Sequence, residues 1–170
     1  MSITSPIAKQ SSKLQPNTSV RCLIFDYGNT LAGQADNWRM TPEAVKLIHE
    51  LALIPGLRLA VLSNAGQVNK DSRQGLRNLL HNAGVLHLFD VVLSLYREGE
   101  MKPCPNAWLR VLHCLEVGAN KAIMFGDAEA DRGSEQAGVR YVFLKYDDPN
   151  FRDIVFNAYS NHNRDDTENR

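Results

Sequence analysis

The chain has 170 residues, of which 44% are hydrophobic and 22% charged, which suffices for one domain with a core and is short for two. Its 19 basic and 19 acidic side chains balance, so bulk charge indicates no surface for nucleic acid or membrane. No apolar run reaches membrane-spanning length. Cys22, Cys104 and Cys114 lack metal-ligand spacing, which favours a reduced, cytoplasmic protein.

The predicted elements alternate along the chain between two polar ends. Residues 1–19 are rich in Ser, Thr, Gln and Asn, so we expect a flexible N-terminal segment. Apolar runs at 20–25, 57–62, 89–95, 122–125 and 139–144 predict five strands. Helical periodicity covers 42–53, with Thr41 as N-cap, then 71–83 and a segment from residue 105. A flexible tail at 159–170 would follow a single domain at 20–158.

This alternation predicts an α/β fold. Strand, helix and strand in repetition are typical of a parallel sheet with right-handed crossovers and helices on both faces. We therefore expect a three-layer, Rossmann-like domain whose five parallel strands lie in the order 5-4-1-2-3. In such a sheet the carboxyl ends of neighbouring strands share one edge, where open α/β folds bind their ligands.

Polar side chains follow three of these strands, and a further one lies in a loop. They occur in the segments FDYGNTL, VLSNAG, MKPCP and FGDAEAD, and the candidate site residues are Asp26, Ser63, Asn64, Lys102, Asp127 and Asp131. The strand order brings them to one crevice. A carboxylate, a hydroxyl donor, a lysine and two further carboxylates together suit phosphoryl transfer.

Each residue type has a part in that chemistry. Asp26 would attack phosphorus as the nucleophile and, with Asp127, would supply the hard oxygen ligands that Mg²⁺ prefers. Lys102 would neutralise phosphoryl charge, and Ser63 with its neighbour Asn64 would bind the phosphate oxygens. Asp131 would support the metal site without binding the ion directly.

The four segments resemble the motifs of the haloacid dehalogenase-like hydrolases, in that family's order, over residues 20–145. The resemblance implies a Mg²⁺-dependent phosphatase with an aspartyl-phosphate intermediate. It also implies a capless member, because the intervals from Asp26 to Ser63 and from Ser63 to Lys102 are too short for the family's cap insertions. We therefore expect an open site for a phosphorylated small molecule or macromolecule, or one closed by a second subunit.

Gly28 departs from the family pattern. Most phosphatases of the family carry a second Asp at this position as the general acid, a role that contributes about 10²- to 10⁴-fold in rate. The family's metal binds the backbone carbonyl of this residue, so Gly28 remains a predicted ligand beside Asp26 and Asp127. Either the substrate has a good leaving group, or another acid such as Asp36 or Glu98 substitutes, or catalysis is weak.

Other functions remain open on the sequence. The main alternative is a pseudophosphatase that binds phosphate or a protein partner. Dehalogenase activity is disfavoured because those relatives need a cap, and a receiver domain because no acidic residue precedes Asp26. A basic stripe at Lys70, Arg73, Arg77 and His81 is typical of a solvated helix face, although it would also suit an anionic substrate.

Overall fold

The computed structural model describes residues 20–64 and 72–168, so the predicted N-terminal segment, 1–19, lies outside it. One sheet contains all five strands: β1 (Cys22–Phe25), β2 (Arg58–Asn64), β3 (Val91–Leu95), β4 (Ala122–Gly126) and β5 (Arg140–Phe143). All four strand pairs are parallel. Their order, β3-β2-β1-β4-β5, is the predicted order read from the opposite edge, so the prediction is confirmed.

In these described ranges, four α-helices connect or follow the strands: α1 (Pro42–Ala52), α2 (Ser72–Asn82), α3 (Asn106–Leu115) and α4 (Phe151–Glu168). Short 3-10 segments are η1 (Gln34–Asp36), η2 (Leu86–Leu88) and η3 (Ala119–Lys121), and η4 (Glu129–Ala137) is longer. The predicted cap of α1 is present, since the Ala44 amide donates to Thr41 Oγ1 at 3.1 Å. Pro42 occupies the first turn, where its missing N–H costs nothing.

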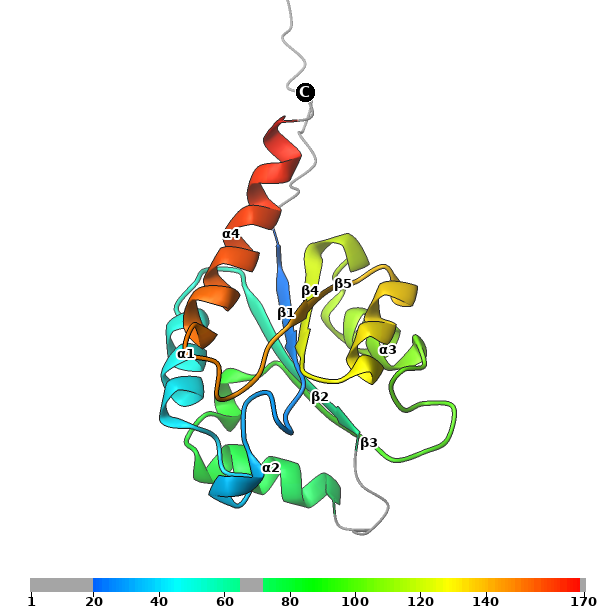
Figure 1. The fold of residues 1–170 in the computed structure, drawn as a ribbon. Coiled ribbons are helices and arrows are strands. Elements are labelled where there is room, and N and C mark those ends of the chain that lie inside the picture. The colour runs from blue at the N-terminus through cyan, green and yellow to red at the C-terminus, as the bar shows by residue number, and fades with distance from the viewer. Residues whose placement is uncertain (1–19, 65–71, 169–170) are drawn as a thin grey trace, which may run out of the picture.

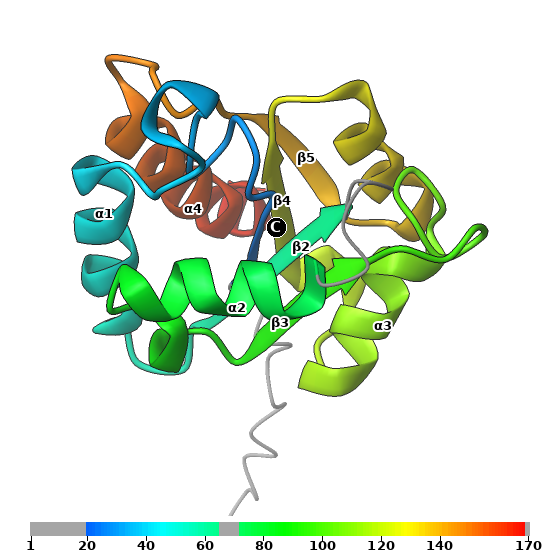
Figure 2. The ribbon, with the colours of Figure 1, turned by 90° about the horizontal axis from the view of Figure 1, so that it is seen from below.

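Helices cover both faces of the sheet (Figures 1 and 2). An apolar core lies on each face beneath them. Alternate residues of each strand point to opposite faces, as the period of a strand requires. Leu23 and Phe25 of β1 belong to the core beneath α1, α2 and α4, while Cys22 and Ile24 belong to the core beneath α3. Phe25 stacks on Phe125 of β4 with ring centroids 5.1 Å apart. Burial on both faces explains the continuous apolar runs in the sequence.

The C-terminal segment differs from the prediction. Residues 159–168 extend α4 instead of starting a tail at residue 159. Tyr159 packs against the core beneath α4, and the ring Nε2 of His162 lies 2.8 Å from the Asn120 carbonyl. Polar composition predicted disorder, but Val155, Tyr159 and His162 recur at helical spacing and place one face of the helix against the domain.

Nothing in the described part of the chain forms a cap over Asp26. Residues 26–41 contain only η1, and residues 72–102 contain α2, η2 and β3. The prediction of a capless domain is therefore confirmed for residues 20–64 and 72–168. Within the same ranges, no helix is both long and apolar enough to cross a bilayer.

Candidate active site

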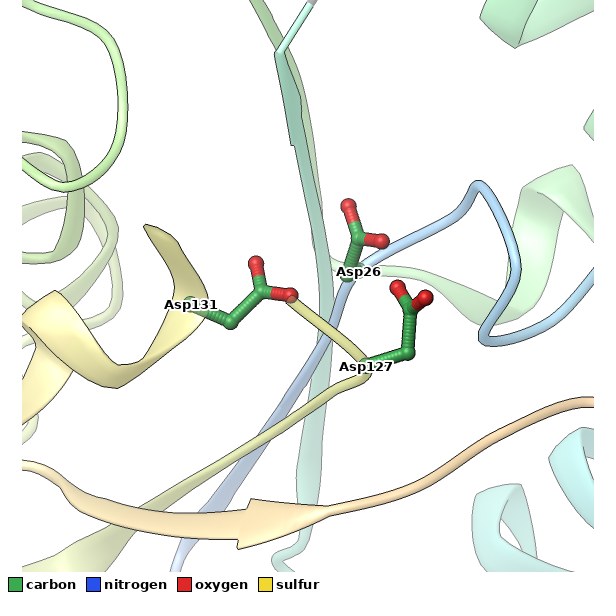
Figure 3. Close-up of side chains that lie close together, drawn as sticks. All are labelled: Asp26, Asp127 and Asp131. Atoms are coloured by element: carbon green, nitrogen blue, oxygen red, sulfur yellow. The ribbon is translucent and has the colours of Figure 1, made fainter. Parts of the chain in front are cut away.

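Asp26 follows β1 directly and is held at the carboxyl edge of the sheet. Its backbone amide donates to the Phe125 carbonyl at 2.9 Å, which continues the pairing of β1 with β4. Only 7% of the residue is exposed. Asp127 follows β4, and its carboxylate points towards the same space as that of Asp26 (Figure 3).

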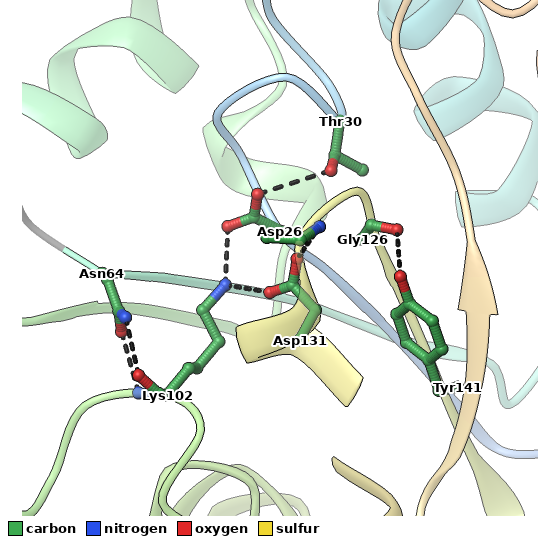
Figure 4. A network of polar contacts seen from close by, with 8 residues as sticks. Asp26, Thr30, Asn64, Lys102, Gly126, Asp131 and Tyr141 are labelled. Carbon is green, nitrogen blue, oxygen red and sulfur yellow. Dashed lines mark hydrogen bonds and ion pairs between the residues drawn. The ribbon is translucent and has the colours of Figure 1, made fainter. Parts of the chain in front are cut away.

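Lys102 joins two of the carboxylates. Its Nζ lies 2.7 Å from Asp26 Oδ1 and 2.5 Å from Asp131 Oδ1, and both contacts are drawn in Figure 4. The lysine side chain is 4% exposed. A buried ammonium is tolerated only when it is paired and hydrogen-bonded, which both acids ensure here. The Lys102 side chain therefore connects its own loop to the end of β1 and to η4.

The charged groups shift one another's protonation. Burial raises the pKa of Asp26 to about 6, and Asp131 adds to the rise, while the nearby Lys102 opposes it. Burial also raises the pKa of Asp127, again with a contribution from Asp131. Both carboxyls thus bind protons more tightly than ordinary aspartates as long as no cation lies between them.

Two glycines allow this close packing. A Cβ on Gly126 would lie 2.3 Å from Asp131 Oδ2, and a Cβ on Gly133 would lie 2.3 Å from the Pro103 carbonyl oxygen. Any larger residue would therefore push η4 away from β4 or from the lysine loop. Both glycines are needed for close approach rather than for turn conformation, since the Asp131 side chain packs on Gly126 and the Pro103 backbone packs on Gly133.

Asn64, the last residue of β2, clamps the lysine loop. Its Nδ2 donates to the Lys102 carbonyl at 3.0 Å, and its Oδ1 accepts from the Lys102 amide at 2.9 Å (Figure 4). This differs from the predicted role of Asn64 in binding substrate, because both ends of its amide hold protein backbone. Ser63 lies in β2 opposite Ser94 and is half-buried, so its predicted phosphate contact remains a prediction.

Three supporting residues were not predicted. Thr30 is fully buried, and its Oγ1 lies 3.4 Å from Asp26 Oδ2. The Ala128 amide donates to Asp131 Oδ2 at 3.0 Å. The Tyr141 hydroxyl donates to the Gly126 carbonyl at 3.0 Å, and burial, helped by Asp131, raises the pKa of Tyr141 to about 12. Only Thr30 had a signal in the sequence, as the last polar residue of the FDYGNTL segment.

The three aspartates provide a donor set for a cation. One carboxylate oxygen each from Asp26, Asp127 and Asp131 lies within 4.8 Å of the other two. Both oxygens of Asp131 already accept hydrogen bonds, from Lys102 and from the Ala128 amide. Asp26 likewise accepts from Lys102 and Thr30, so the assignment of Asp26 and Asp127 as ligands with Asp131 in support remains a prediction. All-oxygen ligands suit Mg²⁺.

Gly28 lies beside this set in an unstrained conformation. Its φ is outside the left-handed region, and a Cβ built on it would meet only Trp38 Cζ3, at 3.6 Å. Within the described residues no hydrogen-bond donor reaches the Gly28 carbonyl, which leaves it available as a third ligand. The position therefore has room for a side chain that the sequence does not supply.

The remaining candidates are not bonded to the cluster in the described residues, although Glu98 lines one pocket with Lys102. Asp36 and Glu98 are exposed, and no hydrogen bond or ion pair connects either side chain to the site within the described residues. Of the basic stripe, Arg77 and His81 are exposed on α2, as expected for a solvated face. Lys70 and the side chain of Arg73 lie outside the described residues.

Comparison with known proteins agrees with this arrangement. The sequence model of one family, described as "Hydrolase: haloacid dehalogenase-like hydrolase", matches residues 17–134. No curated protein matches the chain at a significant level.

Solved structures share the fold. An uncharacterized protein of Corynebacterium glutamicum has a TM-score of 0.62 at 22% identity, over 85% of this chain and 96% of that one. An uncharacterized protein of Listeria monocytogenes has a TM-score of 0.61 at 20% identity, over 74% and 78%. A predicted phosphoglycolate phosphatase of Haemophilus somnus has a TM-score of 0.58 at 20% identity, over 71% and 57%.

Proposed function

Since this chain belongs to the haloacid dehalogenase-like hydrolases, we propose that it is a Mg²⁺-dependent phosphohydrolase that acts through an aspartyl phosphate. The observation that carries the proposal is the buried Asp26 at the end of β1, bonded to Lys102 and close to two further aspartates. A carboxylate in this environment combines a nucleophile with nearby positive charge, which phosphoryl transfer needs.

The reaction divides into two displacements at phosphorus. A carboxylate oxygen of Asp26 forms a bond to phosphorus while the bond to the leaving oxygen breaks, and the leaving group departs with the electron pair. Water then attacks phosphorus, the bond to Asp26 breaks, and inorganic phosphate is released. Lys102, already 2.7 Å from Asp26 Oδ1, offsets negative charge during both steps.

The residues present fit Mg²⁺. Asp26 and Asp127 would hold it through carboxylate oxygens and Gly28 through its carbonyl, with Asp131 fixed behind them by Lys102 and the Ala128 amide. When bound, the ion supplies positive charge that neutralises phosphoryl oxygens. The few protein ligands leave room for water, which Mg²⁺ retains in most sites.

The open site and Gly28 both bear on the substrate. Position 28 carries no acid, and within the described residues neither Asp36 nor Glu98 is bonded to the site, so substrates whose leaving groups depart unprotonated should react best. The lack of a cap admits a phosphorylated small molecule or macromolecule. A second copy of this chain would serve as a lid in a homo-oligomer.

The test is a phosphatase screen with Mg²⁺ or with EDTA over acyl, sugar, nucleotide and protein phosphates. Wild type should release phosphate only with Mg²⁺, and Asp26→Asn should release none, because the amide cannot attack phosphorus. Asp153→Asn, the same change at an exposed position on α4, should keep the wild-type rate. Full activity in Asp26→Asn would refute covalent catalysis by this residue.

A pseudophosphatase is the second candidate, and Gly28 is the observation that favours it. A domain without the general acid can retain its phosphate pocket while losing turnover. Wild type that binds inorganic phosphate or a protein partner, yet hydrolyses none of the screened phosphates, would establish this function in place of the first.

A further inference from the structure

Trp38 borders the candidate site without belonging to the core. The residue is 41% exposed, and its ring atom Cζ3 is the nearest neighbour of the space above Gly28, 3.6 Å from a Cβ built there. The chain's other tryptophan, Trp108, is fully buried beneath the sheet. The indole of Trp38 thus lies against the residue two positions beyond Asp26.

The loop fixes Trp38 through its backbone. The Tyr27 hydroxyl donates to the Trp38 carbonyl at 2.7 Å, and the Trp38 amide donates to the Gly33 carbonyl at 3.1 Å. Gly33 in turn lies against the ring of Tyr146, where a Cβ would come within 2.3 Å of the ring. The placement of Trp38 is therefore set by contacts that do not involve its own side chain.

This placement is also unfavourable for a tryptophan. Trp38 has φ 59° and Asn37 has φ 51°, and a bulky side chain rarely adopts the left-handed region. The residue is also 41% exposed, so the burial that offsets this strain is incomplete. Strain of this kind persists where the surroundings enforce it, and it gathers at ligand sites.

We propose that Trp38 is a specificity-determining residue that stacks on an aromatic leaving group, so that the preferred substrates are phenolic phosphate monoesters. Asp26 and Gly28 are two residues apart, so their Cα atoms are separated by at most about 7 Å. The proposal places a phenyl ring carried by a phosphate at Asp26 against this indole, which contacts Gly28. This inference rests on the proposed function and names its substrate class.

The proposal also accounts for the missing acid. In the first displacement the bond between phosphorus and the phenolic oxygen breaks, and phenolate leaves with the electron pair and takes its proton from solvent. Phenolate is a far better leaving group than an alkoxide, so the step depends less on protonation. Gly28 and the neighbouring ring of Trp38 thus favour the same substrates.

Kinetics with two good leaving groups separate stacking from chemistry. Trp38→Asn should lower kcat/KM on phenyl phosphate about three- to tenfold, mostly through KM, as expected for one lost aromatic pair. Asparagine tolerates positive φ, so this variant should fold. Acetyl phosphate, which has no ring, should be hydrolysed at the wild-type rate, and Trp38→Phe should retain most activity on both compounds.

Two controls show whether the effect is specific to Trp38 and whether the phenol belongs to a small molecule or to a protein. Leu53→Ala alters an apolar residue that is 82% exposed just after α1. It should leave kcat/KM unchanged on both substrates. Comparing phenyl phosphate with a phosphotyrosine peptide shows whether the phenol belongs to a small molecule or a protein. The proposal would be overturned if Trp38→Asn lowered kcat/KM equally on phenyl and acetyl phosphate, or lowered it on neither.

A binding measurement separates this inference from the proposed function. With Mg²⁺ present, calorimetry should show that phenylphosphonate binds wild type more tightly than methylphosphonate, and that Trp38→Asn removes the difference. This result in a protein without turnover would refute the phosphohydrolase and support Trp38 as the aromatic contact. Equal binding of the two phosphonates to wild type, or no binding of either, refutes the role of Trp38.

Discussion

On the scale of single residues, Gly28 is the position at which the chemistry of the site is most open to change. Gly28→Asp should raise turnover on alkyl phosphates, up to the factor of about 10² to 10⁴ typical of general acid catalysis, and should change aryl or acyl phosphates less. The structure accommodates the substitution, since φ is ordinary and the nearest atom, Trp38 Cζ3, is 3.6 Å from the new Cβ. Rates on ethyl and phenyl phosphate measure the contrast.

Gly28→Ala is the matched control for this substitution. It adds the same Cβ beside Trp38 but no acid, so it should leave the ratio of the two rates unchanged. A gain in Gly28→Ala equal to that in Gly28→Asp would mean that loop rigidity, and not proton transfer, limits the wild-type enzyme.

The residues of this site were predictable from sequence to different degrees. Asp26 and Asp127 were predicted because each follows a strand, and Lys102 because it lies in the loop before a helix, at an edge that the strand order fixes. Trp38 was not recognised, because its approach to Gly28 depends on positive φ at consecutive loop residues, which no periodicity reveals. The sequence placed Asn64 at the site, but the direction of its amide depends on the path of the lysine loop.

On the scale of elements, the clamp between β2 and the lysine loop should be essential to the site. Asn64→Asp replaces the donor Nδ2 by an oxygen that faces the Lys102 carbonyl, so the unfolding free energy should fall by about 1–3 kcal/mol. The displaced lysine should reduce kcat/KM by on the order of 10- to 100-fold. Chemical denaturation and phosphatase rates measure the two effects.

Asn82→Asp provides the control for the added charge, since Asn82 is exposed at the end of α2. It should behave like wild type in both assays. An unaltered rate in Asn64→Asp would show that the position of Lys102 does not depend on the clamp.

The end of α4 offers a second prediction at this scale. A chain that ends at residue 158 loses the packing of Tyr159 and the contact of His162 with the Asn120 carbonyl. Its Tm should therefore fall by several degrees, as expected for a loss of about 1 kcal/mol in a domain of this size. Thermal melts that coincide for the short and full chains would restore the interpretation of this segment as a flexible tail.

The secondary structure was predictable wherever apolar residues recur with the period of a helix or form the continuous run of a buried strand. The strands were found because most of their residues are apolar and buried, and their ends differ from prediction by at most two residues. Two elements gave no such signal. η4 has the sequence EADRGSEQA, which is nearly all polar or small, and its place depends on Gly126, Gly133 and Asp131 packing together. The second half of α4 is also polar, and packing at only a few positions orders it.

On the scale of the whole molecule, Mg²⁺ should stabilise the fold, and more so at pH 7 than at pH 5. Binding stabilises by RT ln(1 + [L]/Kd), about 2.7 kcal/mol at 100 times Kd. Without metal, burial raises the pKa of Asp26 to about 6, so its carboxyl is mostly protonated at pH 5 and mostly ionised at pH 7. Mg²⁺ must displace that proton, so affinity should rise about tenfold per pH unit below the pKa. Melting curves measure the shift.

Asp127→Ala should show a smaller shift at both pH values, because it removes a carboxylate ligand, whereas Asp153→Ala on the exposed face of α4 should match wild type. Equal shifts in wild type and Asp127→Ala would count against a cation between these aspartates. A larger shift at pH 5 than at pH 7 would contradict the direction of the Asp26 titration.

The single lysine among the aspartates also has a kinetic consequence. With all groups ionised, the carboxylates of Asp26, Asp127 and Asp131 against the ammonium of Lys102 leave a formal charge of −2 at the bottom of the site. A phosphate dianion that arrives alone is repelled, whereas a divalent cation is attracted. Addition should therefore be ordered, with the cation first and the ester second. The concentration of free Mg²⁺ would then govern how fast the enzyme captures its substrate.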